Sequence, residues 1–288
     1  MGKPLLLCDS TCDLSLEMEH KLGIRVINCP IELEGLPYRE RTEVTSDRIY
    51  ESVARTGVLP HHAQVTVIEF LEAYAKAARD GYTDIICVTM NAQGSGTHSA
   101  AMHAITLLPT EYPALEGKLN VRVIDSGTYA LAMGGPIFHA AEKLAHGASA
   151  AEAGDFLQDY FDHQMTLLGL MSLQYAQKSG RLGACEAVVG SILGIKPILS
   201  IARDNKVIAK TRGDKSLITK MTDLYFEFAA DPKGDYILTW GDNPEDAKEL
   251  VSAIKKRGGG APFLSGPIGP CVAVNAGPKM IGMGFRRT

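Results

Sequence analysis

The sequence predicts an α/β protein with an N-terminal domain built on a parallel sheet between helices and a C-terminal α+β domain. Two observations predict this architecture. The first half of the chain alternates apolar strand patterns with helical patterns, which is typical of a parallel sheet covered on both faces. The second half contains two strand patterns, 196–202 and 206–212, around an Asp-Asn turn, which indicate an antiparallel hairpin. We therefore divide the chain into domains 1–164 and 165–288.

Strand and helix signals alternate through the predicted N-terminal domain. Four apolar runs have the length and composition of strands: 3–10, 24–33, 83–90 and 120–126. Helical patterns occupy 15–22 and 46–55, and a glycine closes each of them. Two more helices are expected to begin at the capping boxes Thr66–Glu69 and Ser149–Glu152, where side chain and backbone can bond reciprocally. The second of these helices should run to about Gln164.

The predicted C-terminal domain mixes helices with strands. Helical patterns occupy 214–230 and 244–256, with a strand pattern at 235–240 between them. The tail 269–285 is expected to form strands broken by Gly-Pro turns. The apolar segment 183–195 carries three glycines, and two interpretations stay open. It is either a buried helix that packs closely through glycine or a smooth wall for an apolar ligand.

Composition and charge exclude several classes of protein. The 288 residues are 45% hydrophobic with a formal net charge of −4, which does not support a nucleic-acid-binding surface. No apolar run reaches the roughly 18 residues of a membrane helix, and the first residues do not resemble a signal peptide. The six cysteines form no CxxC pair and are expected to be reduced, packed thiols. We expect a cytoplasmic protein without stable membrane insertion, nucleic-acid partner or cofactor.

Metal binding is also not expected from the histidine spacing. His98 and His103 are five positions apart, which does not place both on one face of a helix. His61 and His62 are adjacent and point apart in an extended chain. The sequence therefore predicts no metal site.

Small polar residues follow three of the predicted parallel strands. They are Asp9, Ser10 and Thr11 after the first strand, Asn91 to Thr97 after the third, and Asp125 and Ser126 after the fourth. Ligands of open parallel sheets bind beyond the carboxyl ends of the strands. Each residue alone is adequately explained as a helix N-cap. Their coincidence at three strand ends favours a ligand-binding crevice.

The segment 90–105, MNAQGSGTHSAAMHAI, supplies the small and hydroxyl residues expected at this crevice. Gly94 and Gly96 allow close approach of the backbone, and Ser95 and Thr97 supply hydroxyl groups. The helix that follows offers unsatisfied N–H groups and the positive end of its dipole. Such a site suits an anion, either a carboxylate or a phosphate.

Common enzyme motifs are absent from the sequence. It contains no G-x-x-x-x-G-K-[ST] loop and no G-x-G-x-x-G after the first strand. Ser95 lies between glycines but outside the G-x-S-x-G frame. One enzymatic alternative stays open, a small hydrolase or phosphotransferase that uses Ser95 with Asp9 or Asp125.

Five motifs together resemble the DegV family, bacterial proteins that bind fatty acids, some of which are the acyl-binding subunit of fatty-acid kinase. The motifs are CDSTCDL, GSGTHSAA, VIDSGTYALAMG, LQYAQKSGRLG with KPIL behind it, and NAGPKMIG. They are spread over nearly the whole chain in the family's order. The resemblance implies two domains, with one fatty acid between them and its acyl chain buried. It implies a lipid-binding protein rather than an enzyme.

The resemblance also assigns the residues of the site. The ligand carboxylate is held by Ser95 in the turn that continues through Gly96 and Thr97, and by a loop that falls on His62 and Gln64. At these positions the sequence departs from the family twice: His62 replaces a hydroxyl residue, and Asn275 stands where a histidine precedes the late Gly-Pro. We hypothesise that His62 and Asn275 exchange roles at one head-group site. The acyl chain is expected to contact Gly190, Ile192, Leu193 and Ile195.

Kinase-coupled members of the family work with a separate protein that uses ATP to phosphorylate the bound carboxylate. The same partner is therefore a possibility for this chain, which has no nucleotide motif of its own. Arg181, in the glycine-bounded turn KSGRLG, is expected to lie at the surface and to dock that partner. A surface salt bridge or a helix C-cap is the simpler alternative for this arginine.

Overall fold

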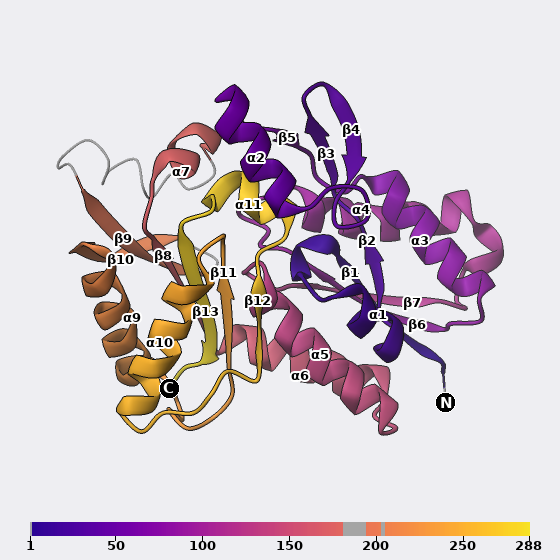
Figure 1. The fold of residues 1–288 in the computed structure, drawn as a ribbon. Coiled ribbons are helices and arrows are strands. Elements are labelled where there is room, and N and C mark those ends of the chain that lie inside the picture. The colour runs from indigo at the N-terminus through magenta and orange to yellow at the C-terminus, as the bar shows by residue number, and fades with distance from the viewer. Residues whose placement is uncertain (1, 181–193, 203–204) are drawn as a thin grey trace. The chain divides into compact units, whose positions relative to one another are not determined.

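The computed structural model describes residues 2–180, 194–202 and 205–288 (Figure 1). By its internal contacts the chain forms two compact units, both of them discontinuous in sequence. The first comprises the chain up to Pro30, Ala63–Tyr129 and Met133–Asp162. The second comprises Ile31–His62, Ala130–Ala132 and the chain from His163 onward. The predicted division at residue 164 stays a prediction; by internal contacts, residues 31–62 and 130–132 group with the chain from residue 163 onward.

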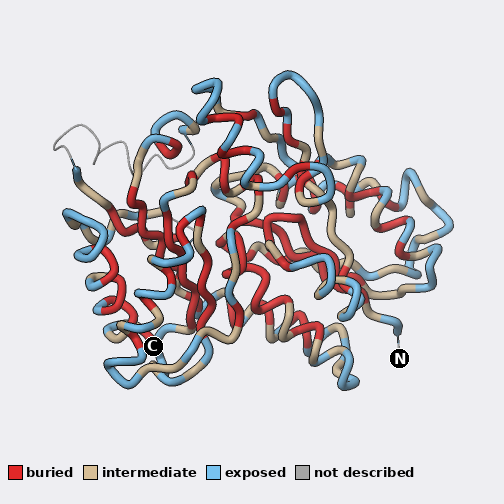
Figure 2. The backbone as a smooth tube through the Cα atoms, in the orientation of Figure 1, coloured by how far each residue is buried: buried red, intermediate tan, exposed pale blue. Residues whose placement is uncertain are grey.

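A four-stranded parallel sheet forms the centre of the first unit, with the strand order β2-β1-β6-β7. Its strands are β1 (Pro4–Asp9), β2 (Arg25–Ile27), β6 (Asp84–Thr89) and β7 (Asn120–Asp125). The middle strands are apolar and buried, which Figure 2 shows as a red centre. All three pairings are parallel, so the carboxyl ends of the strands lie at one edge of the sheet.

Helices cover both faces of this sheet, as the alternating sequence pattern predicts (Figure 1). Helices α3 (Val67–Arg79) and α4 (Thr97–Glu111) pack against each other on one face. On the other lie α5 (Leu131–Ala145) and α6 (Ala150–Asp162), and α6 contacts β6 and β7. The remaining elements are α1 (Leu16–Leu22) and the 3-10 helices η1 (Ser10–Cys12) and η2 (Pro113–Leu115).

The caps of these helices agree with the local sequence signals. Thr66 and Glu69 form a reciprocal capping box at the start of α3. Ser149 and Glu152 do the same before α6, with Ser149 N donating to Glu152 Oε2 over 2.8 Å and Glu152 N to Ser149 Oγ over 3.2 Å. Both predicted capping boxes are confirmed.

A six-stranded mixed sheet forms the core of the second unit, in the order β10-β9-β8-β13-β11-β12. Its strands are β8 (Gln164–Leu170), β9 (Ile195–Ile201), β10 (Lys206–Arg212), β11 (Tyr236–Trp240), β12 (Leu264–Pro267) and β13 (Met280–Arg286). The predicted hairpin is confirmed, because β9 and β10 pair antiparallel.

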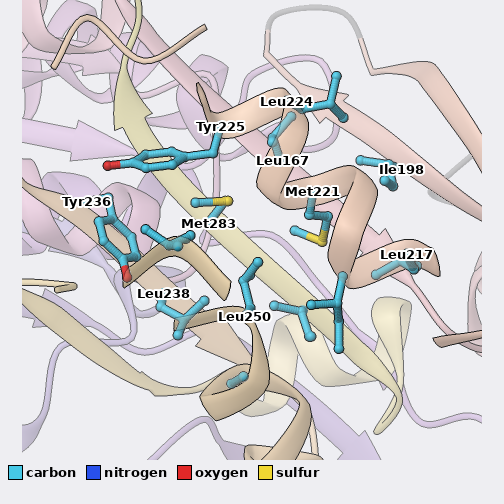
Figure 3. Packing of buried hydrophobic residues seen from close by; sticks show 14 of the residues in the cluster. Leu167, Ile198, Leu217, Met221, Leu224, Tyr225, Tyr236, Leu238, Leu250 and Met283 are labelled. Atoms are coloured by element: carbon cyan, nitrogen blue, oxygen red, sulfur yellow. The ribbon is translucent and has the colours of Figure 1, made fainter. Parts of the chain in front are cut away.

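Helices α9 (Asp214–Phe228) and α10 (Pro244–Lys256) pack against this sheet. Their apolar faces meet the sheet in one buried cluster, shown in part in Figure 3. Tyr225 of α9 belongs to this cluster, with its ring edge-on to Phe285 at 5.1 Å and tilted against Tyr236 at 5.2 Å. Such ring pairs add to the free energy gained by burying the apolar area.

The second unit also contains a smaller layer. Strands β3 (Pro30–Leu33), β4 (Leu36–Arg39) and β5 (His61–His62) form a three-stranded sheet in the order β4-β3-β5. Helix α11 (Pro270–Ala276) packs against β5, against α2 (Ser46–Thr56) and against α7 (Gln174–Ser179). Tyr175 of α7 lies directly over Gly277, where an added Cβ would come within 2.6 Å of its ring.

Two strand predictions are wrong. The run 24–33 is not one strand but two, β2 and β3, which belong to different sheets. Pro30 stands at the break, and proline has no N–H to continue a ladder. The first part of the tail 269–285 is the helix α11 rather than a strand. Pro270 at its first position is compatible with a helix start, and Gly277, with φ of 75°, ends it.

Candidate functional site

The carboxyl ends of strands β1, β6 and β7 meet at one edge of the first unit's sheet. Thr89 at the end of β6 is paired with Asp125 at the end of β7, and Cys8 of β1 is paired with Val88. Asp9 is therefore the last residue of β1 at the same edge. The structure places these strand ends together, as parallel pairing requires. Contact between this edge and a ligand stays a prediction.

The Asp9 side chain is fully buried and accepts hydrogen bonds from two segments of the chain. Its Oδ1 accepts the N–H of Thr11 at 3.1 Å and the hydroxyl of the same residue. Its Oδ2 accepts the N–H of Met90 at 2.7 Å. Burial raises the pKa of Asp9 to about 6, and these hydrogen bonds oppose the rise because they stabilise the carboxylate. Asp9 thus joins the end of β1 to the loop after β6.

The neighbouring polar residues also hold backbone in place. Asp125 Oδ1 accepts the N–H of Ala92 at 3.1 Å and that of Gly127 at 2.9 Å. Ser126 donates its hydroxyl to the carbonyl of Thr128, and the Ser10 hydroxyl oxygen accepts the N–H of Cys29. The predicted edge residues therefore shape the loops beyond the strands, which fits their interpretation as capping residues.

The two glycines of the turn before α4 each accommodate a side chain from elsewhere in the first unit. A Cβ at Gly96 would lie 2.0 Å from Oε1 of Gln64, and one at Gly94 would lie 1.9 Å from the hydroxyl of Tyr129. Neither glycine has a positive φ, so their role is close approach rather than an unusual dihedral angle. The structure thereby brings Gln64 and Gly96 together, as the predicted site requires.

Helix α4 begins without a side-chain cap, which leaves its first turn suited to an anion. Gly96 is the N-cap residue and makes no capping hydrogen bond through a side chain. The Ser95 hydroxyl is 2.9 Å from that of Thr97 and accepts the Thr97 N–H at 3.2 Å. Hydroxyl groups beside the N–H groups of a helix start are donors that suit a carboxylate or a phosphate.

His62 and Asn275, the two residues predicted to share one head-group site, meet in the second unit. The Nε2 atom of His62 is 3.1 Å from Asn275 Nδ2 and 3.4 Å from Asn275 Oδ1. Asn275 Nδ2 also donates to the carbonyl of Cys271 at 2.9 Å. The tertiary structure therefore places the imidazole and the amide in one cluster. Their joint contact with a ligand stays a prediction.

Two residues of this cluster were not predicted from the sequence. Cys271 Sγ is 3.5 Å from Nδ1 of His62, and the buried carboxylate of Glu40 accepts the Cys271 N–H at 2.6 Å. Cys271 and Asn275 are four positions apart, and that spacing places them on one face if the segment is helical. The segment was expected to be a strand, so this signal was missed. Tyr129 was also not foreseen beside Gly94.

Most of the predicted chain-lining residues lie outside the described part of the structure. Arg181, Gly190, Ile192 and Leu193 fall in the range 181–193, which the structure does not describe. Ile195 begins β9 and is partly buried. Their predicted contacts therefore stay predictions.

The geometry gives no support to Ser95 as an enzymatic nucleophile. Its hydroxyl is bonded to Thr97, while the oxygens of Asp9 and Asp125 accept hydrogen bonds from other loops. Among the described residues, no side-chain base is bonded to Ser95. Acyl transfer by a serine requires such a base within hydrogen-bonding reach.

Two further properties bear on the class of protein. No helix in the described ranges is both long and apolar enough to cross a membrane. The five cysteines within those ranges are buried and in the thiol form: Cys8, Cys12, Cys29, Cys87 and Cys271. Reduced thiols were expected, and the sixth, Cys185, falls outside the described residues.

Comparisons with known proteins agree with this architecture. A DegV domain-containing protein of Clostridium perfringens is 28% identical over 281 residues, which is 97% of each chain. A solved structure described as fatty acid binding of a DegV family protein from Thermus thermophilus has a TM-score of 0.87 at 22% identity, over 99% of this chain and 100% of that chain. That of DegV, a fatty acid binding protein from Bacillus subtilis, has a TM-score of 0.84 at 22% identity, with complete coverage of both chains.

These structural likenesses show the fold and confirm the predicted class, with a parallel sheet toward the N-terminus and a mixed sheet toward the C-terminus. A family model for the DegV family matches residues 5–288. That match extends over nearly the whole sequence and includes all five motifs on which the resemblance rests. The chain therefore belongs to the DegV family.

Proposed function

We propose that this protein binds a long-chain fatty acid and holds its carboxylate at the turn before helix α4. The observation that carries the proposal is the uncapped start of this helix, with Ser95, Thr97 and Gln64 gathered around Gly96. Those groups can donate to a carboxylate without adding a positive charge. The solved relatives from Thermus thermophilus and Bacillus subtilis are described as fatty acid binding proteins, which supports the choice of ligand.

In this proposal the remaining predicted residues complete the head group and the acyl-chain contacts. His62 and Asn275 both carry groups that can donate to a carboxylate. Gly190, Ile192, Leu193 and Ile195 contact the acyl chain. No cofactor or metal enters the function, and the protein acts in the cytoplasm, where thiols stay reduced.

The decisive experiment measures fatty acid binding by the purified protein and by the Ser95→Ala variant. Denaturing mass spectrometry should detect fatty acid carried over from the expression host. Removal of a hydrogen bond to a charged group costs about 1.5–3 kcal/mol. Ser95→Ala is therefore expected to weaken palmitate binding roughly tenfold to a hundredfold.

Ser252→Ala is a matched control, because Ser252 is an exposed serine on helix α10. This variant should bind palmitate as the wild type does. Equal affinity in Ser95→Ala and Ser252→Ala would contradict the assignment of the carboxylate to this turn. A covalent acyl adduct on Ser95 would favour the hydrolase alternative instead.

We further propose that the loaded protein presents the carboxylate to a separate ATP-dependent kinase, with Arg181 at the docking surface. The support is the family relationship together with the absence of a nucleotide-binding motif in the sequence. With a fatty-acid kinase catalytic subunit and ATP, the loaded protein should yield an acyl phosphate that hydroxylamine traps. Arg181→Ala should retain palmitate binding and lose this product, and loss of palmitate binding itself would refute the docking role.

A further inference from the structure

A thiol, an imidazole and an amide lie in a row in the second unit. Sγ of Cys271 is 3.5 Å from Nδ1 of His62, and Nε2 of the same ring is 3.1 Å from Nδ2 and 3.4 Å from Oδ1 of Asn275. Each ring nitrogen thus faces a partner. The order Cys-His-Asn is that of cysteine enzymes that catalyse acyl transfer, where it has arisen on unrelated folds.

The fold holds this row from several directions. Cys271 and Asn275 are four positions apart on helix α11 and so share a face. His62 comes from strand β5, which pairs with β3 and packs against α11. The Glu40 carboxylate accepts the N–H of Cys271, and the Asn275 amide donates to the carbonyl of Cys271. Both backbone groups of Cys271 are therefore hydrogen-bonded.

The amide of Asn275 is compatible with the proton movements that thiol activation needs. The tautomer that donates Nε2–H to the amide oxygen, 3.4 Å away, leaves on Nδ1 a lone pair that can take the thiol proton, whereas the tautomer that accepts the amide N–H over 3.1 Å carries its proton on Nδ1. The charged imidazole that results directs Nδ1–H at the thiolate and Nε2–H at the amide oxygen. A neutral partner that keeps the ring oriented in this way is the role of the third residue in such a row.

We infer that Cys271 is a nucleophile, activated by His62 and oriented by Asn275, that accepts the acyl group of an activated long-chain acyl compound. The inference deepens the proposed function, since it rests on the fatty acyl group reaching the residues that recognise its head. The acyl donor belongs to the class of acyl phosphates or acyl thioesters. A free fatty acid has no suitable leaving group and does not react.

The chemical step balances without an oxidant or reductant. His62 Nδ1 takes the thiol proton while Sγ attacks the carbonyl carbon of the acyl phosphate. The bond between that carbon and the phosphate oxygen breaks, and the phosphate leaves with the electron pair and takes the proton from His62. The product is an S-acyl thioester at Cys271. Water then hydrolyses the thioester to the carboxylic acid and restores the thiol.

Two other buried thiols, Cys8 and Cys87, are internal references for this reactivity. Burial raises the pKa of Cys87 to about 12. A hydrogen bond with Cys12, together with burial, raises the pKa of Cys8 well above its usual value. A raised pKa reduces the thiolate fraction and therefore the nucleophilicity. Cys271 is 3% exposed and the other described thiols are 0% exposed, so a comparison with His62→Gln, and not selectivity among the thiols, isolates the effect of the imidazole.

The test incubates the full-length protein separately with lauroyl phosphate, lauroyl-coenzyme A and lauric acid, followed by intact mass measurement and peptide mapping. We expect one acyl adduct on Cys271 with both activated donors and none with lauric acid. Neutral hydroxylamine should remove the adduct. Cys271→Ala should abolish the adduct.

A second measurement separates activation by His62 from binding of the acyl chain. The alkylation rate of Cys271 by iodoacetamide, a small reagent that needs no acyl site, should fall at least tenfold in His62→Gln. The alkylation rate should also fall in Asn275→Ala. It should be partly restored in Asn275→Gln, which a merely structural role of Asn275 would not predict. His61→Gln, a change at the exposed neighbouring histidine, should leave the rate unchanged.

The outcomes distinguish this inference from the proposed function. A protein that binds lauric acid but forms no adduct on Cys271 with either activated donor overturns the inference and leaves fatty acid binding intact. An adduct that forms equally fast in His62→Gln also overturns it. A third outcome is a protein that binds no fatty acid but whose Cys271 is alkylated rapidly, at a rate that depends on His62. That result would reject the proposed function and retain the activated thiol.

Discussion

The imidazole of His62 lies beside the side-chain amide of Asn275, with Nε2 3.1 Å from Nδ2, although 213 positions separate the two residues in the chain. Strand β5 supplies the histidine and helix α11 supplies the asparagine. Their proximity provides the physical basis for the hypothesis that they exchange roles.

If His62 and Asn275 act on one carboxylate, their substitutions should be coupled. His62→Ala and Asn275→Ala should each weaken palmitate binding, and the double variant should weaken it by less than the sum. Residues in one hydrogen-bond network typically show coupling energies of about 0.5–3 kcal/mol. Isothermal titration calorimetry on the four proteins of the cycle measures this coupling.

The neighbouring His61 provides the control, because it is exposed and precedes His62 in the same short strand. His61→Ala should bind palmitate like the wild type. If His62→Ala does the same, His62 is not part of the head-group site, and Asn275 has only a structural role beside it.

Gly96→Ala should weaken palmitate binding by displacing Gln64. A Cβ at position 96 would lie 2.0 Å from Oε1 and 2.8 Å from Cδ of Gln64, so the amide must move. Gln64 is exposed and can rotate, so the free energy of unfolding should change by less than about 1 kcal/mol. Calorimetry should give similar losses of affinity in Gly96→Ala and Gln64→Ala, with little further loss in the double variant. Fully additive losses would show that Gly96 acts independently of Gln64.

Asp9 should make the protein less stable as the pH rises. Burial raises the pKa of Asp9 from 3.8 to about 6, so the folded protein retains this proton at pH values where the unfolded chain has lost it. The resulting stabilisation is present below the unfolded pKa and is lost as the pH rises through about 6. Each pH unit between the two pKa values corresponds to about 1.4 kcal/mol, so the loss amounts to roughly 3 kcal/mol.

Urea unfolding of the wild type and of Asp9→Asn at about pH 4.5 and about pH 7.5 measures this effect. The asparagine is an uncharged reference that does not titrate, so the difference between the two proteins isolates Asp9. The unfolding free energy of the wild type relative to Asp9→Asn should fall from the lower to the higher pH. A difference that does not depend on pH would mean that Asp9 titrates alike in both states.

Affinity should rise with the length of the acyl chain until the available space is filled. Burial of one CH₂ group contributes about 0.8 kcal/mol, so each added carbon should tighten binding roughly fourfold. Calorimetry with fatty acids from decanoic to palmitic acid tests this dependence. Gly190→Phe should shorten the preferred chain while the unfolding midpoint stays near that of the wild type. A flat affinity across the series would contradict a buried acyl chain.

The sequence by itself determined the elements whose signals are local. Such signals are capping boxes, glycines that end helices and the hydrophobic period, and each depends on residues a few positions apart. They correctly located helix α3, helix α10 and the hairpin of β9 and β10. Parallel strands end at the same edge of a sheet, so the position of Asp9 and Asp125 could also be predicted from their places after two strands. The uncapped start of α4 follows in the same way from the Gly-Ser-Gly-Thr turn.

Only the tertiary structure decided which distant groups meet. Glu40 reaches Cys271 across 231 positions, and neither residue carries a local signal for the other. The segment 270–276 was expected to belong to strands broken by Gly-Pro turns, and it is instead a helix that packs against α2, α7 and β5. This packing places Cys271 beside Nδ1 and Asn275 beside Nε2 of the His62 ring. Contacts of this kind arise from packing free energy summed over several elements, which no short window of sequence contains.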